Sequence, residues 1–110
     1  MDDVVIEEIL KFRDEREWKQ YHNPKDLAIS LSLEAAELLE NFQWSSSEEA
    51  VNKRLSCIEE ELADVLIYSV LFADAVDLDL NEIIVKKLSM NNKKYPIKKA
   101  FGKKEKYTEL

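Results

Sequence analysis

The chain has 110 residues, a net charge of −7 and a single cysteine. This length corresponds to one domain, and one Gly with two Pro leaves few turn signals, which favours an all-α fold. The acidic balance argues against duplex nucleic acid as the partner.

The chain shows neither a targeting pattern nor a membrane-spanning segment. The N-terminus, MDDVV, carries acid where a signal peptide carries base. The longest uncharged run, 65–73, is far shorter than the roughly 18 residues that a spanning helix needs. A lone cysteine cannot form an intrachain disulfide, and we expect Cys57 in the core. These features predict a soluble, cytoplasmic protein that does not bind membranes.

The spacing of the apolar residues predicts four helices joined by short loops. Asn23 with a proline after it is typical of a helix start, and residues 45–49 hold two overlapping Ser-x-x-Glu capping boxes. Pro96 ends the last helix. We therefore predict a helical domain over 1–95 and a basic, extended tail over 96–110. The expected helices span about 3–18, 24–43, 47–76 and 80–95.

The second half of the third predicted helix is apolar on nearly every side. Residues 65–76 read VLIYSVLFADAV, and such a helix needs apolar partners all round. The other helices of one small chain supply this only in part, so a second copy is the natural way to complete the core. The fold prediction is a four-helix bundle-like protomer completed by homo-oligomerisation.

Two pairs of acids lie inside the two most apolar segments of the chain. Glu34-x-x-Glu37 and Glu61-x-x-Asp64 each place two carboxylates on one helix face, because residues three apart are neighbours on a helix. A carboxylate in an apolar run is costly to bury unless it is paired, protonated or bound to a cation. Four convergent carboxylates form an oxygen site suited to Mg²⁺ or Mn²⁺. This pattern predicts metal-assisted chemistry on a polyphosphate.

The spacing leaves alternatives open. Two solvated acid pairs on helix surfaces are the simpler interpretation, and Glu60 shares a face with Asp64 as Glu61 does. Glu60 would then support the site from outside or activate a water. A di-iron or di-manganese centre in a helical bundle usually adds Glu-x-x-His pairs, whereas the only histidine, His22, falls in a predicted loop. The absence of imidazole ligands favours Mg²⁺.

Aromatic residues near the predicted helix ends are candidates for substrate contacts. Trp18, His22 and Trp44 either plug the ends of the core or stack on a nucleobase. Tyr68 follows Asp64 by four residues on the same face, so it is either an ordinary core residue or an extension of the acid site towards a sugar.

Cations and amides on the last predicted helix form a second candidate surface. Lys87, Asn91 and Lys94 share one face, and Tyr95 follows them. Lysines at a helix C-terminus usually complement the helix dipole. The functional interpretation is contact with phosphate groups.

Several stretches of the sequence together resemble a known family. They are W-x-Q-Y-H-N-P at Trp18–Pro24, E-A-A-E-L-L-E-N-F-Q-W at Glu34–Trp44, E-E-L-A-D-V-L-I-Y at Glu60–Tyr68, K-x-x-x-N-x-x-K-Y-P at Lys87–Pro96 and K-Y-T-E-L at Lys106–Leu110. Over roughly residues 9–110 the chain resembles the MazG-like, all-α nucleoside triphosphate pyrophosphohydrolases, particularly the dCTP pyrophosphatase type.

The resemblance implies a bundle that dimerises and often pairs again into a tetramer. It implies hydrolysis of the α–β bond of a nucleoside triphosphate, with Mg²⁺ as the required metal ion and Mn²⁺ as the alternative. The substrate would be dCTP or a related or modified dNTP, and the reaction would clean the nucleotide pool. Glu34, Glu37, Glu61 and Asp64 would then be the metal ligands and catalytic residues. The implied substrate contacts are Trp18, Trp44 and Tyr68 for base and sugar, and Lys87, Asn91 and Lys94 for phosphate. We expect His22 and Tyr95 to contact the substrate as well.

Two positions depart from the family pattern. Ile9 stands where the dCTP-specific relatives carry a histidine facing the base, and Lys94 stands where arginine is frequent. Lysine is a point charge without the bidentate fork of arginine. Both differences bear on base preference and leave the metal chemistry unaffected. The alternatives are the same fold acting on dUTP or phosphoribosyl-ATP, and a non-enzymatic helical interaction module.

Overall fold

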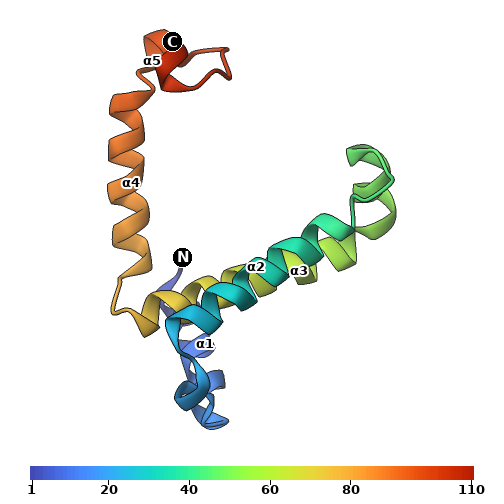
Figure 1. The fold of residues 1–110 in the computed structure, drawn as a ribbon, viewed down its shortest axis with the longest axis vertical. Coiled ribbons are helices and arrows are strands. Elements are labelled where there is room, and N and C mark those ends of the chain that lie inside the picture. Colours follow the sequence, from blue (N-terminus) through green and yellow to red (C-terminus); the bar gives the residue numbers. More distant parts are fainter. The chain divides into compact units, whose positions relative to one another are not determined.

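A computed structural model describes residues 1–110 as an all-helical chain without strands (Figure 1). This confirms the predicted fold class. The contacts divide the chain into two compact units, Met1–Leu78 and Asp79–Leu110. The predicted boundary at residue 95 stays a prediction. The helices are α1 (Asp3–Glu15), η1 (Trp18–Tyr21), α2 (Pro24–Glu40), α3 (Ser47–Ala75), α4 (Leu80–Lys94), α5 (Ile97–Ala100) and η2 (Tyr107–Glu109).

Capping side chains begin three of these helices, at the predicted positions Asn23 and Ser46 and also at Asp79. The side chains of Asn23, Ser46 and Asp79 each accept a hydrogen bond from the backbone N–H three residues further on, at 2.9, 3.2 and 2.9 Å. Of the two overlapping capping boxes before α3, the chain uses the one at Ser46. Each bond satisfies a backbone donor that the first helical turn leaves open.

The first helix is shorter than predicted. It ends at Glu15, and Glu17 adopts a left-handed backbone conformation with φ of 54°. The chain then turns into η1, where Trp18 packs edge-on against Phe12 with ring centroids 5.7 Å apart. A turn of this kind leaves the apolar period intact, which is why periodicity extended the helix to Trp18.

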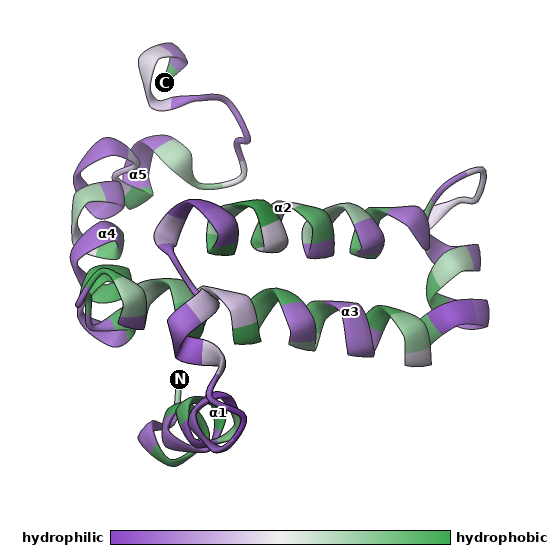
Figure 2. Cartoon of the chain, turned by 60° about the horizontal axis from the view of Figure 1, so that its bottom comes forward, coloured by the Kyte–Doolittle hydropathy of each residue, from purple (hydrophilic) through white to green (hydrophobic).

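The helices α2 and α3 form an antiparallel hairpin, and α1 packs on α3 (Figure 2). The fully buried apolar core of this unit is small: Leu27, Ala50, Val70, Leu71 and Ala73. Apolar side chains recur along both helices of the hairpin, and many lie at the surface. Six of them are 44–68% exposed, namely Ile29, Leu33, Leu39, Leu55, Leu62 and Leu66. None of the helices has the length and apolar character needed to cross a membrane.

The predicted core position of Cys57 is wrong, because this residue is exposed. The α1 helix reaches α3 around Asp64 and Asp74, which lie in the C-terminal half of α3. Cys57 lies N-terminal to this stretch of α3, and its side chain is exposed. Apolar sequence neighbours alone therefore gave the wrong environment for this residue.

The second unit contains α4 and the basic tail. The tail was predicted to be extended, but it forms the short helices α5 and η2. The Tyr107 ring packs edge-on against Tyr95, with centroids 6.1 Å apart, and lies 5.1 Å from the Lys94 ammonium nitrogen. Aromatic and cation–π contacts of this kind hold the tail to the end of α4.

Candidate functional site

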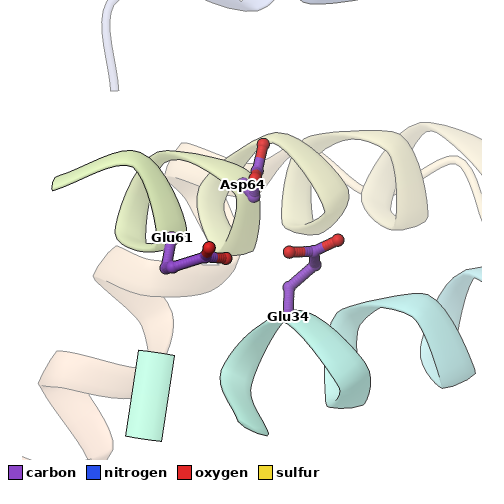
Figure 3. A group of neighbouring side chains, drawn as sticks. All are labelled: Glu34, Glu61 and Asp64. Atoms are coloured by element: carbon purple, nitrogen blue, oxygen red, sulfur yellow. The ribbon is translucent and has the colours of Figure 1, made fainter. Parts of the chain in front are cut away.

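Three of the four predicted acids converge between α2 and α3. Glu34 extends from α2 towards α3, which carries Glu61 and Asp64 (Figure 3). One carboxylate oxygen from each lies within 4.8 Å of the others, and all three residues are half-buried. The antiparallel hairpin brings the two sequence motifs to the same level, and the three-residue spacing turns Glu61 and Asp64 to one side of α3. We call these three residues the acid cluster.

The fourth predicted acid, Glu37, lies at the edge of the acid cluster. It is exposed, and its interaction with Glu34 and Glu61 raises the pKa of both carboxyl groups. Two carboxyl groups can form a hydrogen bond only when one of them carries a proton. Glu60, the alternative that spacing left open, is exposed and lies outside the acid cluster.

The electrostatics of the acid cluster disfavour full ionisation. Burial, together with the hydrogen bond with Glu37 and the charges of Glu37, Asp64 and Glu61, raises the pKa of Glu34 to about 7. The hydrogen bond with Glu37, followed by burial and neighbouring charge, also raises the pKa of Glu61. Burial, hydrogen bonding and like charges at close range thus all act to keep a proton on the acid cluster.

Two oxygens of the acid cluster lack any hydrogen-bond donor. Glu34 Oε2 and Glu61 Oε2 are buried without a hydrogen-bond partner. Buried polar atoms without partners are rare because each costs free energy. A hard divalent cation would satisfy both oxygens and offset the repulsion among the acids. The residues therefore fit Mg²⁺ or Mn²⁺.

The raised pKa of Glu34 predicts that metal binding depends on pH. A carboxyl group must lose its proton to bind a cation, so the affinity for Mn²⁺ should fall about tenfold per pH unit below 7. The stability of the metal-free protein should change with pH in the opposite direction. The pKa of Glu34 is about 7 in the folded chain and 4.5 in the unfolded chain, so the folded state binds this proton more tightly. Its contribution to the free energy of unfolding is therefore lost as pH rises through about 7. Calorimetric Mn²⁺ titrations at pH 6, 7 and 8 test this, and equal affinities at all three values would contradict it.

A chamber of about 390 Å³ adjoins Asp64, enclosed by α1, the segment around η1 and α3. Its volume falls in the range of small-molecule sites. Three of the predicted substrate contacts line it together: Trp18, His22 and Tyr68. Its apolar walls come from Val5, Ile9, Phe12, Ile67 and Leu71.

His22, which lines this chamber, carries an unsatisfied atom. Its Nδ1 atom is buried without a hydrogen-bond partner. Burial lowers the pKa of the imidazole, and the charge of Arg13 lowers it further. The ring is therefore neutral at pH 7, and it can accept or donate a hydrogen bond.

The other predicted substrate residues belong to the loop after α2 and to the second unit. Trp44 is 96% exposed, with a left-handed φ of 63° in the loop after α2, and it does not line the chamber. Lys87, Asn91 and Lys94 lie on α4, and Tyr95 caps its C-terminus. These four belong to the second unit, where Lys94 and Tyr95 contact the Tyr107 ring.

Sequence reasoning missed the buried Arg13, which borders the chamber and is only 4% exposed. Its Nε atom donates to Asp14 at 2.8 Å and its Nη1 atom to Asp74 at 2.6 Å, which ties α1 to α3. A signal was present in the sequence. Asp74 is a lone acid in the apolar run 65–76, and a buried charge needs a partner.

The chain is thus an all-α protein in which a cluster of carboxylates suited to a metal ion lies beside a small-molecule chamber. Residues 29–110 match the MazG-like family. The chain therefore belongs to the MazG-like family.

Individual relatives are consistent with this assignment. A pyrophosphatase from Archaeoglobus fulgidus, known from its crystal structure, is 43% identical with a TM-score of 0.80, over 86% of this chain and 91% of that one. The dCTP pyrophosphatase 1 proteins of Mus musculus and Homo sapiens are 38% and 37% identical over 105 residues. That match covers 91% of this chain and 62% of theirs, so the chain spans less than two-thirds of the length of these curated relatives.

Proposed function

We propose that the protein is a Mg²⁺-dependent nucleoside triphosphate pyrophosphohydrolase. It would cleave the α–β phosphoanhydride of dCTP, or of a related or modified dNTP, to the monophosphate and pyrophosphate. The observation that carries the proposal is the acid cluster with its two unsatisfied buried oxygens, next to a chamber large enough for a small molecule. The relatives named pyrophosphatase and dCTP pyrophosphatase 1 support the same chemistry.

The acid cluster would bind the triphosphate through the cation, and the chamber would bind the nucleoside. Glu34, Glu61 and Asp64 would hold the cation, with Glu37 beside them. A divalent cation bound there supplies the charge neutralisation that attack on a polyanion requires. Trp18 and Tyr68 would pack against base and sugar, as flat side chains with a polar edge do.

Proton transfer would fall to a carboxylate of the site. Glu34 or Glu37 would act as the general base that accepts the proton of the attacking water. The water oxygen bonds to the α-phosphorus while the bond from that phosphorus to the bridging oxygen breaks. Pyrophosphate then leaves. Lys87, Asn91, Lys94 and Tyr95 stay predicted phosphate contacts.

The test is turnover of a panel of canonical and modified nucleoside triphosphates, together with phosphoribosyl-ATP, in Mg²⁺ and in EDTA. The proposal predicts monophosphate and pyrophosphate in Mg²⁺ and no turnover in EDTA. Equal rates in both, or release of orthophosphate alone, would exclude this reaction. No turnover of any compound would favour the alternative, a helical interaction module.

We also propose that the protein is a homo-oligomer, a dimer or a tetramer. The apolar surface on α2 and α3 supports this, since six of its side chains are 44–68% exposed around a small core, and large exposed apolar patches usually mark interfaces. Light scattering coupled to size exclusion should give at least twice the 12.9 kDa of the chain. Replacement of Leu62 with Lys should shift the mass towards the monomer, and a monomeric wild-type protein would overturn the proposal.

A further inference from the structure

The chamber carries one charged group that no part of the fold uses. Glu8 lines the chamber from α1, its side chain is exposed, and it forms no hydrogen bond or ion pair. It therefore lies on the open side of the chamber. The other charged residues of the lining are Arg13 and Asp64, and Asp64 belongs to the acid cluster.

Arg13 is committed to the packing of α1 on α3. Two of its nitrogen atoms donate to Asp14 and Asp74, and its side chain is almost wholly buried at the inner end of the chamber. The apolar walls cannot discriminate between ligands by hydrogen bonding, and Trp18, His22 and Tyr68 add uncharged hydrogen-bonding atoms to the lining. Glu8 is thus the one uncommitted charged side chain that a ligand in the chamber would meet.

We propose that Glu8 is a specificity-determining residue that selects nucleobases bearing an exocyclic amino group. This inference rests on the proposed function, in which the chamber takes the base. An ionised carboxylate only accepts hydrogen bonds. It matches the amino group of cytosine or adenine, as carboxylates do when they read cytosine in nucleic acids, and it repels the keto oxygen that uracil and thymine present instead.

The test compares dCTP with dUTP, which differ at the 4-position of the base by an amino or a keto group. The wild-type protein should prefer dCTP in kcat/KM. Glu8→Gln should lower the dCTP-to-dUTP ratio about tenfold, because an amide can turn to donate to the keto oxygen. Glu7→Gln is the matched control. Glu7 is also exposed and loses the same charge, but it does not line the chamber, so the ratio should not change.

A binding experiment separates this inference from the proposed function. Calorimetry with dCMP and dUMP measures base selection without turnover. Tighter binding of dCMP, lost in Glu8→Gln and kept in Glu7→Gln, would support the role of Glu8 even if no triphosphate is hydrolysed. Equal affinities for the two monophosphates in the wild-type protein, or a preference that Glu8→Gln leaves unchanged, would overturn it. Thermal melting should not differ, since Glu8 has no partner to lose.

Discussion

Replacement of Glu61 with Gln should lower nucleoside triphosphate hydrolysis at saturating Mg²⁺ by at least about a hundredfold. Substitution of groups that merely support metal ligands typically costs 10–100-fold, and Glu61 would contribute an oxygen of the acid cluster itself. The change is nearly isosteric, so the loss reports on charge and not on packing. Steady-state kinetics over a range of Mg²⁺ concentrations measure it.

The same substitution should not destabilise the metal-free protein. The pKa of Glu61 is raised by its hydrogen bond with Glu37, by burial and by neighbouring charge, so removal of its ionisable group relieves repulsion. The melting temperature without metal should stay level or rise. Glu59→Gln is the matched control, because Glu59 is exposed and outside the acid cluster, and its activity should match the wild type. Full activity in Glu61→Gln would remove the acid cluster from the mechanism.

Replacement of Asp74 with Asn should destabilise the fold by about 2 kcal/mol. Loss of one partner of a buried ion pair costs about 3–5 kcal/mol. The cost is smaller here because Asp74 is 32% exposed and Asp14 still pairs with Arg13. The loss corresponds to a fall in melting temperature of roughly 10 °C for a domain of this size. Thermal and urea unfolding measure it.

Asp77→Asn provides the control for this stability prediction. Asp77 is exposed with a left-handed φ of 56°, a conformation that asparagine tolerates, so the same loss of charge should leave stability unchanged. The double variant Arg13→Met with Asp74→Leu should recover much of the loss, because it leaves no unpaired buried charge. If Asp74→Asn melts with the wild type, the ion pair does not hold α1 on α3.

The position of the acids was predictable from the sequence, and the position of Arg13 was not. Glu61 and Asp64 share a face because of helix geometry alone, and their apolar surroundings in the sequence indicate burial. Arg13 pairs with a residue 61 positions away, and helical periodicity contains no information about where α1 lies along α3. The prediction that Cys57 is buried was wrong for the same reason, because its burial depends on which part of α3 the first helix covers.

Some residues of the chamber could be predicted from the sequence, and others could be recognised only from the structure. Trp18 and Tyr68 were predicted from their aromatic character and spacing, and both line it. Glu8 was not singled out, because a glutamate on an exposed helix face is usually just solvated. Its role emerges only when α1 is seen to form one wall of the chamber.

A crystal structure of the protein soaked in Mn²⁺, with anomalous scattering data, tests the central claim most directly. We predict an anomalous peak for a Mn²⁺ ion bonded to oxygens of Glu34, Glu61 and Asp64, where two buried carboxylate oxygens now lack hydrogen-bond partners. Mn²⁺ bound only elsewhere, in protein that is active with Mn²⁺, would contradict the account.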